Sequence, residues 1–134
     1  MLILSFDFGM RYIGVAIGQK LTNTTNSLPA ILAKDGIPQQ GQLEKLIEEW
    51  RPSVIIVGNP LNLDGSMQEI TFCARKFANR LREKYQLPVH LIDESYSTKQ
   101  AKQITNFHEH RDYLAALNSK AAEIILQRWL ESGN

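Results

Sequence analysis

Two acidic positions stand where apolar strands are expected to end. Asp7 interrupts the apolar run that begins at Leu2, and Asp93 and Glu94 directly follow the apolar run 89–92. A carboxylate among apolar residues is costly to bury unless a cation or hydrogen-bond donors pair with it. These acids are therefore the first candidates for chemistry. The alternative for Asp7 is an acid that only hydrogen-bonds turn amides, and the first strand by itself favours neither interpretation.

Acidic side chains at the ends of parallel strands can form a metal site. The carboxyl ends of such strands share one edge of an open α/β sheet, where these sheets place their ligand sites. Carboxylates of Asp7 and Glu94 gathered there would repel each other unless a cation lay between them. Loosely arranged carboxylate oxygens suit Mg²⁺ or Mn²⁺, which also accept phosphate oxygens as ligands. Such ions can drive phosphodiester hydrolysis.

The elements that must position these acids alternate along the chain. The apolar pattern predicts a strand–turn–strand over 2–18, followed by further strands and helices. Ser66 and Glu69 have the spacing of a capping box, which predicts a helix that begins at Ser66 and stops before Pro88. The order β-β-β-α-β-α-β-α-α predicts a mixed sheet with helices on both faces. The other predicted strands are 28–33, 54–57 and 89–92, and the other predicted helices are 39–50, 97–107 and 119–130.

Length and composition favour a single domain over residues 1–134. The chain has 15 Lys and Arg against 14 Asp and Glu, so any basic surface that binds nucleic acid must be local. Cys73 is the only cysteine, so no disulfide can form within the chain, which suits a reducing compartment such as the cytoplasm. No apolar run approaches the ~20 residues of a membrane span, and we expect no membrane partner.

Three stretches resemble the YqgF-type family of RNase H-like proteins, in the expected order. They are DFGMRYIGVA at 7–16, VGNPLNLDG at 57–65 and DESYST at 93–98. This family is described as Holliday-junction resolvases or as nucleases of pre-ribosomal RNA, and the resemblance spans nearly the whole chain. It implies an RNase H-like mixed five-stranded sheet in the order 3-2-1-4-5. It also implies phosphodiester hydrolysis in the cytoplasm with Mg²⁺ or Mn²⁺ as cofactor.

The same resemblance suggests the catalytic residues. Asp7 matches the family's first catalytic acid and Glu94 its second, and both are the expected metal ligands. The family's third acid stands just before the last helix, where this chain has Asn118. An amide oxygen can still ligate a metal, but one negative charge is lost. Residues that could substitute, without the family's placement, are His108, His110, Asp112 and Glu123.

Candidate contacts to nucleic acid are Arg11, Asn62, Lys76 and Arg80. Arg11 lies in the first turn, near Asp7, and could hold a phosphate. Asn62 lies in a strand-end loop, where ordinary turn chemistry explains it equally well. Lys76 and Arg80 are four residues apart in a predicted helix, as in a track for a phosphate backbone. A solvated helix face explains the same spacing and is the more common case.

The leading hypothesis is an endonuclease that processes structured RNA, such as pre-16S rRNA, in ribosome biogenesis. One alternative is a resolvase of four-way DNA junctions. Another is a nucleic-acid-binding relative with weakened catalysis, because the third acid is replaced by Asn118. The motif at 7–16 also resembles the phosphate hairpin of actin-like and sugar-kinase ATPases, but 134 residues cannot supply the two domains they need. We expect a monomer or a weak homodimer.

Overall fold

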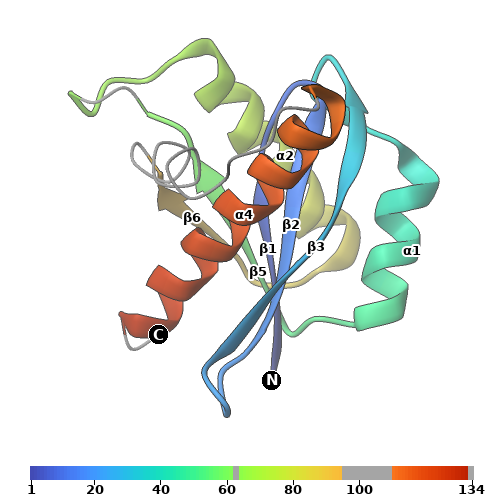
Figure 1. The fold of residues 1–134 in the computed structure, drawn as a ribbon, viewed down its shortest axis with the longest axis vertical. Helices are drawn as coiled ribbons and strands as arrows, with labels where there is room; N and C mark the ends of the chain where they lie inside the picture. The colour runs from blue at the N-terminus through green and yellow to red at the C-terminus, as the bar shows by residue number, and fades with distance from the viewer. Residues whose placement is uncertain (62–63, 95–109, 133–134) are drawn as a thin grey trace.

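The computed structural model of the protein describes residues 1–61, 64–94 and 110–132. A mixed sheet of six strands has helices on both faces (Figure 1). The strands are β1 (Leu2–Asp7), β2 (Tyr12–Gln19), β3 (Thr24–Lys34), β4 (Ile37–Pro38), β5 (Val54–Asn59) and β6 (Val89–Asp93). The described helices are α1 (Gln40–Trp50), α2 (Glu69–Tyr85) and α4 (His110–Glu131).

The strand order is β4-β3-β2-β1-β5-β6. It confirms the expected order 3-2-1-4-5 and adds one short edge strand. The turn at Asp35 and Gly36, both at positive φ, sends Ile37 and Pro38 back to pair with the end of β3. The prediction of five strands missed β4, because two residues carry no periodic signal.

The direction of the strands brings several carboxyl ends to one edge. β1 pairs antiparallel with β2 and parallel with β5, and β5 pairs parallel with β6. β1, β5 and β6 therefore end at the same edge of the sheet, which we call the carboxyl edge. Asp7 is the last residue of β1, and Glu94 immediately follows β6.

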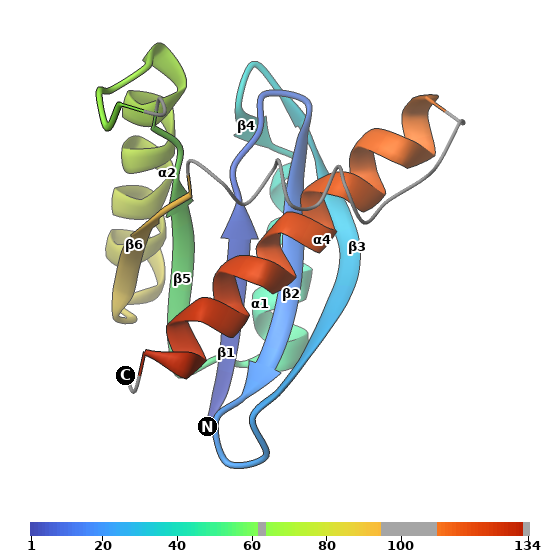
Figure 2. The same cartoon turned by 60° about the vertical axis from the view of Figure 1, so that its left-hand side comes forward.

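Side-chain alternation along β1 divides the core between the two faces of the sheet. Leu4 and Phe6 point to the face covered by α1 and α2, where Phe6 packs edge-on against Phe77. Ile3 points to the other face, where it packs with residues of α4 such as Ile125. Figure 2 shows that, of the described helices, α4 crosses this second face and α1 and α2 lie behind the sheet. Asp7 has the parity of Ile3, so it belongs to the α4 face.

α4 lies close to the sheet because small residues lie beneath it. A Cβ added to Gly14 would lie 1.9 Å from the main-chain oxygen of Asn118. The register between β2 and β3 shifts between Ile13 and Val15, and the side chain of Ser119 bridges the two strands there. Its Oγ accepts a hydrogen bond from Val15 N and donates one to Leu28 O. Asn118 and Ser119 are thereby fixed over the β1–β2 hairpin.

Two helix boundaries differ from the prediction. α2 begins at Glu69 with Gln68 as its N-cap, and Gln68 N donates to Thr71 Oγ1, so the expected cap at Ser66 is wrong. Ser66 N instead donates to Asp64 Oδ1 within the preceding loop. α4 begins at His110 rather than near Ser119, so Asn118 lies inside the helix and not at its start. The predicted helix 97–107 lies outside the described residues.

None of the helices in the described ranges is long and apolar enough to cross a membrane.

Candidate active site

Asp7 and Glu94 form a buried carboxyl pair at the carboxyl edge. Their residues are only 3% and 4% exposed, and their carboxyl groups hydrogen-bond to each other. Burial raises the pKa of Asp7 to about 6, against the opposing effect of its hydrogen bond with Glu94. Burial, and then the charge of Asp7, raise the pKa of Glu94 well above its usual range, although Arg128 lowers it. Two buried carboxyls in contact hold a proton between them when no cation is bound.

Glu94 is held over a glycine of the neighbouring strand. A Cβ added to Gly58 of β5 would lie 2.6 Å from Glu94 Oε2 and 2.8 Å from Ile125 Cδ1. Glu94 N donates to the main-chain oxygen of Asn59, which fixes the start of the loop after β6. Gly58 therefore leaves the space in which the Glu94 carboxylate fits between β5 and α4. Sequence reasoning missed this role, although a glycine ending a β-branched run is a recognisable signal.

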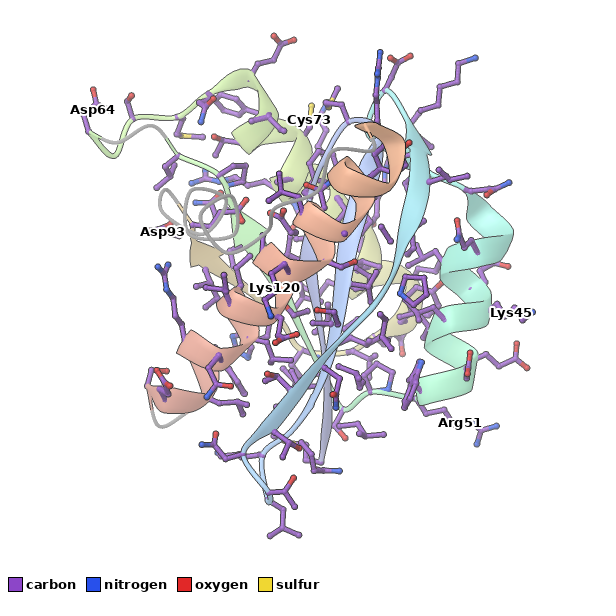
Figure 3. The ribbon with its side chains drawn as sticks, viewed as in Figure 1. Lys45, Arg51, Asp64, Cys73, Asp93 and Lys120 are labelled. Atoms are coloured by element: carbon purple, nitrogen blue, oxygen red, sulfur yellow. The ribbon has the colours of Figure 1, made fainter. Side chains whose placement is uncertain are left out.

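Asp93 points away from this pair. It is the partner of Asn59 in the β5–β6 register, and its Oδ1 accepts a hydrogen bond from Asn59 Nδ2 over 3.1 Å. Figure 3 shows Asp93 at the β6 side of the molecule. Neighbouring residues in an extended chain point to opposite faces, so only Glu94 reaches Asp7. The structure thus places these two acids as the sequence predicted.

Asn118 lies above the β1–β2 hairpin, whose first strand ends at Asp7. Its Nδ2 donates to the main-chain oxygen of Tyr12 over 3.1 Å and lies 3.5 Å from the position of a Cβ on Gly9. The main chain of Asn118 lies over Gly14, which pairs with Asp7 in the hairpin. The structure therefore brings Asp7, Glu94 and Asn118 to one edge, and the amide of Asn118 has a structural partner of its own.

The oxygens of this site fit a hard divalent cation. Glu94 Oε2 is buried and has no hydrogen-bond partner, and burial raises the pKa of both carboxyl groups, an effect that a bound positive ion would relieve. Carboxylate oxygens at a site with few protein ligands suit Mg²⁺ or Mn²⁺, which keep several waters. Within the described ranges, no group of three or more His, Cys, Asp or Glu side chains gathers to hold a metal. Asp7 and Glu94 would thus be the charged ligands, with an amide beside them.

The proposed substitutes for a third acid do not join the pair within the described structure. Glu123 accepts hydrogen bonds from Ser27 Oγ and Lys120 Nζ, on the side of α4 over β3. Figure 3 shows Lys120 on the outer face of α4. His108 lies outside the described residues, as do the side chains of His110 and Asp112.

The candidate nucleic-acid contacts fall into two groups. Arg11 is exposed in the β1–β2 turn, whose main chain is fixed by Ala33 N donating to Arg11 O over 2.7 Å. Arg11 therefore lies in the turn that follows β1 at the carboxyl edge. Lys76 and Arg80 are exposed on α2, on the face of the sheet opposite to α4. Asn62 lies outside the described residues.

A family model and relatives of nearly the same length both identify the family of this chain. The family model described as "RuvX: Holliday junction resolvase" matches residues 1–132. A protein of Histophilus somni (strain 2336), named "Putative pre-16S rRNA nuclease", is 44% identical over 135 residues, covering 98% of this chain and 94% of the relative. A protein of Sodalis glossinidius with the same name is 47% identical over 133 residues, covering 96% and 93%.

A solved structure supports the fold. Thermus thermophilus RuvC, in complex with a Holliday junction substrate, matches with a TM-score of 0.59 at 13% identity. The match covers 98% of this chain and 94% of the RuvC chain. At this identity the likeness shows the RNase H-like fold alone. The family model and the two relatives go further: this chain belongs to the RuvX family, the YqgF-type family that its three motifs indicated.

Proposed function

We propose that this chain is a divalent-metal-dependent endonuclease that hydrolyses phosphodiester bonds in structured RNA, with precursor 16S rRNA as its substrate. The observation that carries the proposal is the buried pair Asp7–Glu94 at the carboxyl edge, with an unpartnered oxygen on Glu94. The names of its relatives support the RNA substrate. The cytoplasm is the proposed location, where Cys73 would stay reduced.

Asp7 and Glu94 would hold Mg²⁺ or Mn²⁺ through their carboxylate oxygens. The bound ion would supply a water of lowered pKa and positive charge beside the leaving oxygen. The chain contributes the position of its two acids, because β1 and β6 are parallel to β5 and end together. Both acids must lose their shared proton before they can ligate, so binding of the ion is linked to pH.

Asn118 and Arg11 would act around this pair. The side-chain nitrogen of Asn118 is occupied by Tyr12 O, which leaves Oδ1 as its second polar atom. Since an amide is neutral, the site has two negative charges, and a second ion would be poorly neutralised. Arg11, exposed at the same edge, would contact a phosphate of the substrate. We therefore expect weak metal binding and slow turnover.

Cleavage of labelled substrates tests the proposal. Structured RNA, single-stranded RNA and a four-way DNA junction are compared with Mn²⁺, with Mg²⁺ and with chelator. We expect Mn²⁺-dependent cleavage of structured RNA that falls by at least about a hundredfold in Asp7→Asn, which keeps the shape of the side chain and removes its charge. Turnover unchanged by Asp7→Asn would overturn the proposal.

The second candidate function is resolution of four-way DNA junctions. The description of the family model, "Holliday junction resolvase", favours it. Preferential cutting of the four-way junction in the same assay would support it over RNA processing. Tight binding of either nucleic acid without cleavage would instead support a relative weakened by the neutral Asn118.

A further inference from the structure

An aromatic side chain stands exposed in the first turn of α2. Phe72 is 55% exposed, although the residues before and after it, Thr71 and Cys73, pack toward the sheet. Its position opposes that of Ala74, Phe77 and Leu81, which form the buried stripe of the helix. Phe72 therefore points away from the core, where a phenyl ring gains nothing from folding.

Basic side chains continue the surface from Phe72 along the helix. Arg75, Lys76 and Arg80 are exposed, and in the described part of the chain none of them belongs to an ion pair. Lys76 and Arg80 follow Phe72 at successive intervals of four residues, or about 6 Å of helix rise each. From 70 to 82 the sequence, ITFCARKFANRLR, contains basic but no acidic residues. We call Phe72, Arg75, Lys76 and Arg80 the α2 strip.

The α2 strip begins at the carboxyl edge, where the candidate active site lies. The first turn of α2 is tied to the end of β5, because Thr71 Oγ1 donates to the main-chain oxygen of Pro60. Figure 3 shows Cys73, the neighbour of Phe72, at the same end of the molecule as Asp64 in the β5–α2 loop. Phe72 lies in the turn of α2 nearest this edge, and the basic residues lie farther along the helix, on the face of the sheet opposite to α4. A nucleic-acid strand that passed from the site over this edge would therefore meet Phe72 before the basic residues.

We propose that the α2 strip binds a single-stranded segment flanking the cleaved structure, with one base stacked on Phe72 and the phosphates along Arg75, Lys76 and Arg80. A ring beside unpaired cations matches single-stranded nucleic acid, which offers exposed π faces and negative charge in alternation. A duplex would use the cations but not the ring, because its bases are already stacked. This inference rests on the proposed function for the identity of the substrate.

Binding of matched RNAs tests the inference without cleavage. An RNA hairpin with a blunt end and the same hairpin with a single-stranded flank on either side are titrated in chelator by fluorescence anisotropy. We expect a flank to tighten binding to the full chain about tenfold. Phe72→Ala and Phe72→Leu should remove most of that gain, whereas Phe72→Trp should retain it, with quenching of the new tryptophan's fluorescence. Leu32→Ala is the matched control, because Leu32 is 51% exposed on β3 and lies outside the strip.

The salt dependence of binding tests the basic residues separately. Neutralising Lys76 as Lys76→Gln should reduce the slope of log affinity against log salt for the flanked hairpin by about 0.7. A flank that gives no gain in affinity, or a gain that is unchanged in Phe72→Ala, would overturn the inference. Failure of the proposed function looks different: metal-dependent cleavage would be missing while the flank still binds through Phe72.

Discussion

Asn118 Nδ2 donates a hydrogen bond to the main-chain oxygen of Tyr12 over 3.1 Å, so the residue at the third-acid position also holds the β1–β2 hairpin to α4. An aspartate there could not make this bond. Its carboxylate would face a carbonyl oxygen and would lie near the Asp7–Glu94 pair as well. Asn118 therefore stabilises the protein when no metal is bound, whereas an aspartate at this position would strengthen the binding of a metal ion.

Asn118→Asp should therefore change stability in opposite directions with and without metal. Without metal we expect a loss of about 1–3 kcal/mol, from the broken hydrogen bond and the added charge. At saturating Mn²⁺ the variant should gain more in melting temperature than the parent, and turnover should rise. A metal titration followed by thermal melting measures both.

Asn118→Ala is the control for this comparison. It removes the same hydrogen bond and adds no charge, so it should lose stability without a larger metal-induced gain. Equal gains in Asn118→Asp and the parent would show that position 118 does not contribute to metal binding.

Glu94→Gln and Asp93→Asn form a matched pair of variants. Glu94 contacts Asp7 inside the site, whereas Asp93 accepts a hydrogen bond from Asn59 on the other side of the chain. We expect Glu94→Gln to reduce cleavage by at least about a hundredfold and Asp93→Asn to keep most of it. The reverse ranking in a steady-state cleavage assay would mean that Asp93 is the ligand.

The metal-free protein should become less stable as the pH rises from about 4 to about 6. The pKa of Asp7 is about 6 in the folded state against 3.8 for an unperturbed aspartate, so over this range the folded state retains a proton that the unfolded state has lost. Stability then falls with pH; Asp7 alone contributes at most about 3 kcal/mol once the pH exceeds 6, and Glu94, whose pKa is also raised, adds to the loss. Denaturant titrations in chelator measure this slope, which Asp7→Asn should flatten. If Asp7→Asn left the pH dependence of stability unchanged, Asp7 would not be the group that causes it.

Gly58→Ala should disturb the site, because the new Cβ would lie 2.6 Å from Glu94 Oε2. We expect cleavage to fall by about a hundredfold as the carboxylate is displaced, with a stability loss of about 1–3 kcal/mol. Gly41→Ala is the control, since nothing lies within 4 Å of a Cβ there and alanine suits a helix better. Cleavage rates of the two variants are compared at a temperature below the melting temperature of each. Normal activity of Gly58→Ala would show that the reaction does not need Glu94 in this position.

The sequence alone determined the main elements and the first acid. The apolar runs of β1, β5 and β6 and the position of Asp7 at the end of β1 are local patterns, so they were predicted correctly. The three motifs predicted the family, and the resemblance to that family implied the strand order; both are confirmed. The predicted last helix began near Ser119, whereas α4 begins at His110, because the polar run 106–112 suggested a loop although residues 113–117 are apolar.

Only the tertiary structure decided how the site is assembled. Strand alternation says that Asp93 and Glu94 face opposite ways, but the pairing of β6 with β5 decides that Glu94 is the one that meets Asp7. The bond from Asn118 to Tyr12 and the space above Gly58 depend on how closely α4 approaches the sheet. These contacts join residues far apart in the chain, and their geometry follows from packing between elements rather than from any local preference of the residues themselves.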